Sequence, residues 1–364
     1  MDKNNGAIYD ARKLGKPKMI ILGVQHMFAM FGATILVPIL TGLDISTTLL
    51  MAGLGTLLFH CITKFKVPAF LGSSFAFLGG YAAIKAFSPN DPNSMLPYAC
   101  LGVACAGLIY FILAAVIKAV GIEKVMRFFP PVVTGPIIIA IGLGLAPSAV
   151  SNCTTNWFLA VVALAVIVVF NIWGKGMAKI IPIILGLLIS YGTGLVLYFI
   201  SQANPDIIQN VPWLFSGGAD ANGVYQPIFD FTSLNTICDN ISKGHIFGSE
   251  GLIGIPIHWD KTVFGGIDYS NGALIASSII AIVPIAFATM MEHSGDICAI
   301  SSTTGNNYIK DPGLHRTLVG DGLATTLASL FGGPANTTYG ENTGVLALTR
   351  VYDPRVIRIA AYFA

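Results

Sequence analysis

Long apolar runs separated by short polar stretches cover most of this chain. A helix that crosses a membrane needs about 20 predominantly apolar residues, and the runs approach or exceed that length. We expect spans over residues 18–42, 45–63, 67–87, 96–120, 131–151, 157–173, 179–200, 272–299, 314–332 and 334–350, with the start of an eleventh near 356. The pattern predicts an all-α polytopic membrane protein.

Two of these spans contain an interruption that a continuous helix would not have. The third span begins near Pro68 and the tenth at Pro334, and each continues with a short Ser, Thr and Gly stretch before a normal helical pattern. Non-helical backbone at membrane depth must lie inside protein, because lipid offers its N–H and C=O groups no partners. We therefore predict two half-helices whose N-termini form a polar site rich in hydrogen-bond donors.

The interrupted spans belong to an internal repeat. Gln25-His26 near the first span resembles Glu292-His293 near the eighth, and the breaks of the third and tenth spans lie at nearly the same offset. Seven spans separate the two copies, and an odd number inverts the second copy relative to the first. By this symmetry the second copy continues beyond Ala364, so we expect the sequence to be C-terminally incomplete.

The distribution of basic residues predicts the orientation in the membrane. With the N-terminus inside, all of the 20 lysines and arginines fall on the inner side except Lys85, Lys243 and Lys261. An excess of basic residues marks cytoplasmic loops. We expect a cytoplasmic N-terminal tail (1–17), an extracellular loop (201–271) and a multi-pass location in the inner, or cytoplasmic, membrane.

Composition excludes other classes of protein. Hydrophobic residues make up 54% of the chain and charged residues 10%, whereas soluble domains carry about 25% charged residues. The net charge of +2 includes no basic block suited to a phosphate backbone, so no nucleic-acid partner is expected. The six cysteines form no CxxC pair, and we expect no metal site.

Ionisable side chains within the predicted spans are candidates for function, because each costs about 2.5 to 3.5 kcal/mol on insertion scales. Glu292 and Asp296 are four residues apart and lie on one helix face. Glu341 follows the break of the tenth span, where a helix N-terminus favours negative charge. Structural and functional roles both stay open for three others, His26, His293 and Asp321.

Four motifs lie along nearly the whole chain. They are QHMFAMFGAT from Gln25 to Thr34, GSSF from Gly72 to Phe75, DPGLHR from Asp311 to Arg316, and TTYGENTG from Thr337 to Gly344 with a following Thr349-Arg350. Together they resemble the nucleobase/ascorbate transporter family and, within it, the branch of bacterial uracil permeases. The last motif, which contains Glu341-Asn342, is similar to the family signature.

The resemblance implies a fold of fourteen spans in two inverted repeats of seven, of which ten to eleven are present here, with short β-strands in broken spans 3 and 10. Spans 1 to 4 and 8 to 11 would form a core domain, here residues 18–120 and 272–364. Spans 5 to 7 and 12 to 14 would form a gate domain, here residues 131–200. The implied activity is proton-coupled uracil uptake by movement of core against gate, often as a homodimer.

The resemblance also implies roles for individual residues. The implied substrate-binding residues are Ala33, Phe75, Glu292, Tyr339, Gly340 and Glu341. The implied proton-coupling residues are Glu292, Asp296 and Glu341, and a structural or gating role is implied for Gln25, His26, Asp321 and Asn342. No cofactor is expected, and the proton is the expected coupling ion, with Na⁺ left open.

Uracil suits the chemistry of these residues. It presents two N–H donors and two carbonyl acceptors, which carboxylates and half-helix N–H groups complement, while Phe75 can cover a ring face. One position departs from the pattern, because uracil permeases commonly have His where this chain has Asp296, as purine transporters do. Glu341 resembles the uracil branch, since purine transporters usually have Gln there. We expect uracil, with a xanthine or purine permease as the alternative.

Two further classes are weaker alternatives. An uncoupled channel would use the same midplane site, although internal repeats are typical of alternating-access transporters. An enzyme is not expected, because the chain contains no HExxH, GxSxG or Walker A motif.

Overall fold

The computed structural model describes residues 7–121, 124, 131–175, 178, 182–220, 222–232 and 256–364. It divides into two compact units, the first comprising Met1–Ile141 and Pro256–Ala364 and the second Gly142–Ile255. Residues 1–6 of the predicted tail and 233–255 of the predicted outer loop lie outside the described residues.

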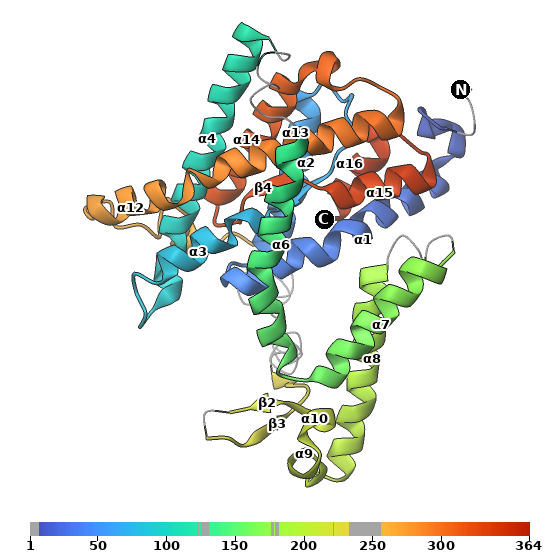
Figure 1. The fold of residues 1–364 in the computed structure, drawn as a ribbon, viewed down its shortest axis with the longest axis vertical. Helices are drawn as coiled ribbons and strands as arrows, with labels where there is room; N and C mark the ends of the chain where they lie inside the picture. The colour runs from blue at the N-terminus through green and yellow to red at the C-terminus, as the bar shows by residue number, and fades with distance from the viewer. Residues whose placement is uncertain are drawn as a thin grey trace, which may run out of the picture. The chain divides into compact units, whose positions relative to one another are not determined.

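The first unit is mostly helical (Figure 1). Its α-helices are α1 (Lys16–Thr41), α2 (Ile45–Ile62), α3 (Leu78–Lys85), α4 (Leu96–Val120), α12 (Gly272–Ile282), α13 (Ile285–Thr304), α14 (Leu314–Leu330), α15 (Gly340–Thr349) and α16 (Pro354–Phe363). Its short helical turns are η1 (Ala11–Leu14), η2 (Phe75–Phe77), η3 (Pro92–Met95), η5 (Trp259–Lys261) and η6 (Ile309–Gly313). Helix α6 (Pro131–Cys153) crosses the boundary between the two units.

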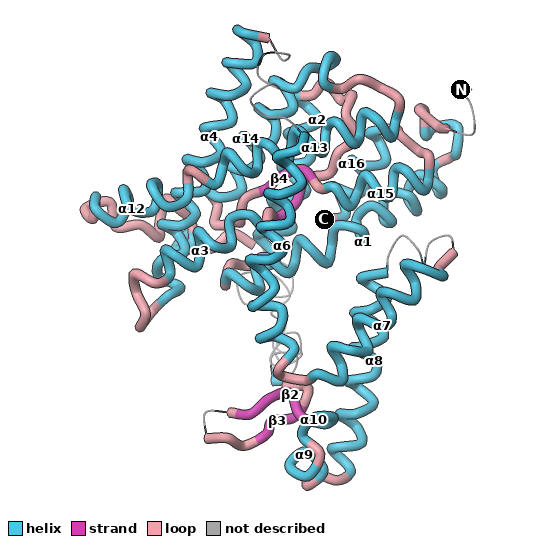
Figure 2. The backbone as a smooth tube through the Cα atoms, in the orientation of Figure 1, coloured by secondary structure: helices cyan, strands magenta, loops and turns pink. Residues whose placement is uncertain are grey.

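A pair of short strands lies among the helices of this unit (Figure 2). Strand β1 (Leu71–Ser73) pairs antiparallel with β4 (Asn336–Thr338), with Gly72 opposite Thr337. All six residues are buried, so their backbone groups need partners. Helix α2 supplies Thr56, whose hydroxyl bonds both the N–H and the C=O of Leu71, at 2.9 and 3.2 Å. The backbone of both broken segments thus lies inside protein, as predicted.

The two half-helices leave the strand pair toward opposite ends of α1, as Figure 1 shows. Helix α3 ends at Lys85, whose ammonium donates to the carbonyl of Thr41, the last residue of α1, at 3.0 Å. Helix α15 is followed by Arg350, whose carbonyl accepts from the N–H of Ile8 at 2.8 Å, just before α1 begins. The two broken segments therefore run in opposite directions.

Helices α4 and α14 approach closely because small residues face each other. A methyl group added at Gly107 would lie 2.7 Å from the carbonyl oxygen of Gly322, and one added at Gly322 would lie 2.6 Å from that of Gly107. Neither position has room for a side chain. This close packing holds α14, which contacts β4, against the rest of the unit.

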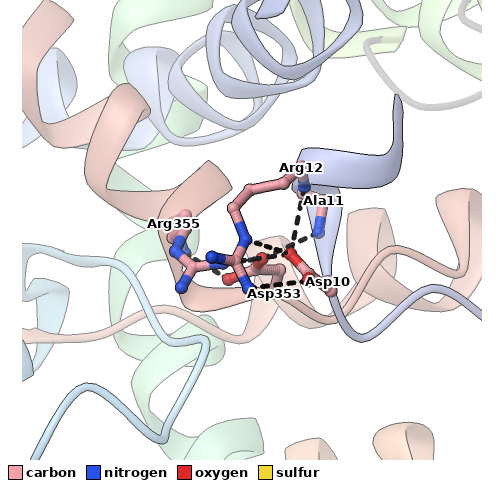
Figure 3. Close-up of polar contacts among 5 residues, drawn as sticks. All are labelled: Asp10, Ala11, Arg12, Asp353 and Arg355. Carbon is pink, nitrogen blue, oxygen red and sulfur yellow. Dashed lines mark hydrogen bonds and ion pairs between the residues drawn. The ribbon is translucent and has the colours of Figure 1, made fainter. Parts of the chain in front are cut away.

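Part of the predicted N-terminal tail is folded. We call Ile8–Leu14 the N-terminal strap. The N–H of Tyr352 donates to the carbonyl of Ile8 at 2.8 Å, and the N–H of Ala11 donates to Asp353 Oδ2 at 2.8 Å. Asp10 accepts from the guanidinium of Arg355 at 3.0 Å (Figure 3). The strap thereby attaches to the segment between α15 and α16.

The second unit is built on two antiparallel apolar helices and a hairpin. Its elements are α7 (Trp157–Trp173), α8 (Pro182–Ala203), α9 (Ile207–Asn210), α10 (Pro212–Phe215), β2 (Ser216–Ala219) and β3 (Tyr225–Pro227). Asn156 caps α7 by accepting from Leu159 N–H at 2.9 Å, and its amide donates to the carbonyl of Ser216 at 2.8 Å. One side chain thus joins the start of α7 to the hairpin.

The structure differs from the predicted eighth span, 272–299, in two ways. The helix is interrupted between α12 and α13 at Pro284, which has no N–H to donate. It also continues to Thr304, beyond the apolar run. The polar residues there satisfy themselves within the helix, since Ser301 and Thr304 donate to the carbonyls of Ile297 and Ile300 at 2.6 and 2.9 Å.

Several helices in the described part of the chain are long and apolar enough to cross a membrane. They are Lys16–Thr41, Ile45–Ile62, Pro92–Val120, Pro182–Ala203 and Gly272–Thr304. Shorter apolar helices cover Phe75–Lys85 and Trp157–Trp173, the latter with the bounds that the sequence predicts. Large apolar side chains on α7 and α8 are exposed, and Leu164 and Leu187 are each 62% exposed. Such exposure is expected of residues that face lipid.

Candidate substrate site

The residues expected to bind the substrate come from elements that pack against one another in the first unit. Helix α1 carries Ala33, η2 begins with Phe75, α13 carries Glu292, and α15 begins with Gly340. Helix α15 contacts both α1 and α13, and α13 contacts η2. Ala33, Phe75 and Glu292 are half-buried and Gly340 is exposed, whereas the strand pair beside them is buried. These residues line an accessible surface beside a packed core.

Three carboxylates lie on α13 and α15. Glu292 and Asp296 are one turn apart on α13, and both are half-buried. A methyl group added at Gly340 would lie 3.3 Å from Asp296 Oδ1, so this carboxylate lies against the start of α15. Glu341 occupies the first turn of α15, where the free N–H groups of the helix favour negative charge. The arrangement combines hydrogen-bond acceptors with backbone donors.

Tyr339 is placed differently from its neighbours Gly340 and Glu341. Its side chain is 5% exposed, and its hydroxyl donates to the carbonyl of Ser73 at 2.8 Å. The hydroxyl also lies 3.3 Å from Thr34 Oγ1. The ring packs over the strand, since a methyl group at Gly72 would lie 2.6 Å from Tyr339 Cε2. The phenol therefore points into the core.

Asp321 and His293 meet at the end of β4. Both side chains are fully buried, and Asp321 Oδ1 accepts from both the N–H and the hydroxyl of Thr338. His293 Nδ1 lies 2.8 Å from the same hydroxyl, which accepts from it because its hydrogen is directed to Asp321. Asp321 thus bonds to the strand that precedes α15, and it does not lie at the surface lined by Glu292.

Three other predicted residues also lie in the core. Gln25, His26 and Asn342 are 3%, 1% and 1% exposed. Gln25 and His26 belong to α1 and Asn342 to α15, two helices that contact each other. The structure therefore separates these residues from the accessible surface that the half-buried Glu292 lines.

Hydroxyl residues around the strand pair were not among the predicted site residues. Thr34, Thr56 and Thr325 each bond to the strands or to Tyr339, and Thr338, in β4 itself, donates to Asp321. A Ser or Thr in an apolar helix is weak evidence for a role at a site, because these side chains commonly bond to carbonyls of their own helix. In this chain Thr63 does so, donating to the carbonyl of Phe59 at 2.8 Å.

No group of three or more His, Cys, Asp or Glu side chains in the described ranges is arranged to hold a metal ion. The residues at the site are instead a mixture of carboxylates, backbone N–H groups and one aromatic ring. Such a set suits a flat, polar organic ligand.

Comparison with known proteins decides the family. Residues 17–364 match the sequence profile of the Permease family. The chain belongs to this family. It is 36% identical over 354 residues to the uracil permease of Bacillus caldolyticus, an alignment that covers 95% of this chain and 70% of that protein. It is 37% identical over 363 residues to a probable uracil permease of Haemophilus influenzae, covering 97% of this chain and 73% of that one. The family predicted from the motifs is confirmed.

A solved structure supports the fold. The transmembrane domain of a cyanobacterium bicarbonate transporter, BicA, superposes with a TM-score of 0.52 at 14% identity, covering 95% of this chain and 80% of that one. With the family assignment, this likeness confirms the prediction of a mostly helical integral membrane protein. The chain is a permease and not an enzyme, as the sequence predicts.

Proposed function

We propose that this permease carries uracil across the cytoplasmic membrane together with a proton. The observation that carries the proposal is the placement of Glu292, Asp296 and Glu341 around the start of the half-helix α15, on elements that contact η2 and its Phe75. Relatives from Bacillus caldolyticus and Bacillus subtilis that are named uracil permeases align over 95% of this chain, which supports the proposal.

Uracil recognition follows from the chemistry of the site. Glu292 and Glu341 each accept a hydrogen bond from one of the two ring N–H groups, which a carboxyl oxygen can do whether or not the group is protonated. Backbone N–H groups at Gly340 and Phe75 donate to the carbonyl oxygens, because the first N–H groups of a helix have no partners within it. The Phe75 ring covers one face of the base, and Ala33 borders the site from α1.

Proton coupling follows from the closeness of like charges. Asp296 lies one turn from Glu292 on α13 and against Gly340, the residue that precedes Glu341 at the start of α15. Several carboxylates close together in a low-dielectric setting do not all stay ionised, so a proton shared among them lowers the energy. A proton bound here is carried with the base, and Glu292 is the residue we assign to it. Na⁺ would be the alternative coupling ion.

Alternating access would rest on the symmetry of the fold. The opposite directions of α3 and α15 support two inverted repeats of seven spans. We propose that the core (18–120 and 272–364) moves against a gate that includes residues 131–200, with the N-terminus in the cytoplasm and two copies forming a homodimer. Movement of the core would expose the surface lined by Glu292 to each side of the membrane in turn.

Xanthine is the second candidate substrate, and one residue favours it. Asp296 stands where the uracil branch commonly has His, and it is typical of purine transporters. Glu341 favours uracil, because an ionised carboxylate accepts from an N–H while the usual Gln of purine transporters offers both a donor and an acceptor.

The test is uptake of labelled uracil by bacteria that lack their own uracil permease and express the complete coding sequence. We expect saturable accumulation against a gradient, which a protonophore abolishes. Glu292→Gln keeps the shape of the side chain and removes its charge, and we expect at least a hundredfold loss of uptake. Asp260→Asn, at an exposed acid of η5, is the matched control and should transport normally.

Three outcomes would contradict the proposal. Accumulation by Glu292→Ala at the wild-type level would exclude this residue as the binding and coupling group. Stronger competition by unlabelled xanthine than by unlabelled uracil would favour the purine reading. Uptake that neither saturates nor responds to pH would indicate a channel.

A further inference from the structure

Three hydroxyl groups form a closed set of hydrogen bonds at the point where α1, β1 and α15 meet. Tyr339 donates to the carbonyl of Ser73 at 2.8 Å, and Ser73 Oγ donates to the carbonyl of Thr34 at 2.9 Å. Thr34 Oγ1 lies 3.3 Å from the Tyr339 oxygen and 3.1 Å from Met30 Sδ. We call Thr34, Ser73 and Tyr339 the hydroxyl cluster.

Each hydroxyl hydrogen in the cluster already has a protein acceptor. Those of Tyr339 and Ser73 are directed to backbone carbonyls, and that of Thr34 is directed to the Tyr339 oxygen or to Met30. All three side chains are buried, at 0%, 2% and 5% exposure for Thr34, Ser73 and Tyr339. A ligand could receive a hydrogen bond from Tyr339 only if the buried Ser73 carbonyl lost its partner, which costs about 1 to 3 kcal/mol.

The cluster joins three of the four elements that line the candidate site, namely α1, the segment that leads into η2, and the start of α15. Thr34 directly follows Ala33, Tyr339 directly precedes Gly340, and Ser73 lies two residues before Phe75. Each cluster residue therefore lies one or two residues along the backbone from a residue that we assign to substrate binding. A shift of one hydroxyl changes the distance between the N–H donors at Gly340 and those at Phe75, which a flat ring must meet together.

Packing reinforces these bonds. A methyl group at Gly72 would lie 2.6 Å from Tyr339 Cε2 and 2.8 Å from Thr34 Oγ1, so the tyrosine ring contacts the strand with no intervening side chain. The N–H of Tyr339 also donates to the carbonyl of Phe70 at 3.0 Å. Ring, strand and helix are thus held at fixed separations.

We propose that Tyr339 is a positioning residue: through the hydroxyl cluster it sets the spacing between α1 and the two half-helix starts, and its phenol does not contact the substrate. The inference rests on the proposed uracil function. Thr34 and Ser73 have the same positioning role in this proposal. Removing a hydroxyl from the cluster should therefore raise the Kd of every ligand of the site by the same factor.

The test compares ligands in the purified protein expressed from its complete coding sequence. Dissociation constants for uracil, 2-thiouracil and 4-thiouracil are measured with wild type and Tyr339→Phe. Sulfur is a weaker acceptor than oxygen, so each thio analogue weakens one ligand contact and keeps both ring N–H groups. We expect Tyr339→Phe to raise the Kd about tenfold for all three ligands, the equivalent of about one lost net hydrogen bond.

Two further variants test whether the cluster acts as a unit. Thr34→Val keeps the shape of the side chain and removes its hydroxyl, and we expect a Kd raised by about fivefold. The double variant should resemble Tyr339→Phe alone, because residues in one hydrogen-bond network are not additive. Should Tyr339→Phe fail to fold, Thr34→Val and Ser73→Ala answer the same question with the three ligands.

Tyr98→Phe is the matched control. Tyr98 is also 5% exposed, and its hydroxyl accepts from the N–H of Asp268 at 2.9 Å, near the start of α4 and outside the hydroxyl cluster. We expect its Kd values to stay within twofold of wild type even where its thermal stability falls. The control thus distinguishes a Kd that rises because the whole protein is less stable from a Kd that rises because the geometry of the site has changed.

Three results would overturn the positioning role. The first is a rise of the Kd in Tyr339→Phe that is absent for one of the thio analogues. The second is a double variant whose Kd rises by the product of the two single effects of Thr34→Val and Tyr339→Phe. The third is a set of folded variants whose Kd values equal those of the wild type. Failure of the wild type to bind uracil would instead contradict the proposed function, so the two failures are distinguishable.

Discussion

Asp321 accepts two hydrogen bonds from Thr338 on a single carboxylate oxygen, from the N–H at 2.9 Å and from the hydroxyl at 3.0 Å. Both residues are buried, and Thr338 is the last residue of β4. Because α15 begins two residues later, this one carboxylate fixes where the half-helix starts. The position of the proposed donor at Gly340 therefore depends on a residue that lies outside the site.

We expect Asp321→Ala to lower stability by about 2 to 4 kcal/mol, since it leaves two buried donors of Thr338 without an acceptor. Uracil uptake should be lost with it. Asp321→Asn keeps one acceptor oxygen and should be intermediate. Thermal unfolding in detergent measures the first effect, with Asp260→Ala at an exposed position as control. A wild-type melting temperature for Asp321→Ala would contradict the role in holding β4.

Gly55 is predicted to be intolerant of any side chain. A methyl group there would lie 2.1 Å from Asn336 Nδ2, which donates to the carbonyl of Met51 at 2.8 Å. We expect Gly55→Ala to cost about 1 to 3 kcal/mol, because Asn336 and the start of β4 must move. Gly192→Ala in α8 meets no atom within 4 Å and should be neutral or slightly stabilising. Equal unfolding temperatures for the two variants would refute this.

The N-terminal strap is expected to depend on Asp353. This residue is 4% exposed, and its side chain accepts from the N–H of Ala11, which is fully buried. Asp353→Ala should destabilise the attached strap by about 1 to 3 kcal/mol, visible as faster protease cleavage or amide exchange at residues 8–14. Asp10→Ala is the matched control, since surface ion pairs contribute little. Faster cleavage in Asp10→Ala than in Asp353→Ala would reverse the assignment.

Attachment of the strap should not vary with pH between 5 and 8. The hydrogen bond from the Arg12 guanidinium lowers the pKa of Asp10 from 3.8 to about 2. A carboxyl whose pKa falls on folding contributes its stability above the unfolded pKa and loses it as the pH falls through the folded pKa. The contribution is thus complete at neutral pH and is lost only below about pH 4. Amide exchange at Ile8, corrected for its intrinsic pH dependence, should stay constant across that window, and a step near pH 6 would contradict it.

Much of the fold is readable from local sequence. Helix α7 has the predicted bounds, Trp157 to Trp173, and the breaks after Pro68 and Pro334 appear as β1 and β4. These features depend on apolar transfer and on the lack of backbone partners in lipid, which each segment experiences by itself. The interruption at Pro284 was missed because the apolar run continues on both sides of the proline. The extension to Thr304 was missed because hydropathy does not record the bonds that polar side chains make within a helix.

The sequence by itself determined the class of protein, most of the long apolar helices, the two broken segments and the family. Only the tertiary structure decided that Tyr339 directs its hydroxyl to Ser73, that Asp321 holds Thr338, and that Ala11 bonds to Asp353. The physical reason is the range of the interactions. Hydropathy and backbone satisfaction are properties of neighbouring residues, whereas a hydrogen bond between Ser73 and Tyr339 joins positions that come together only when the two strands pair.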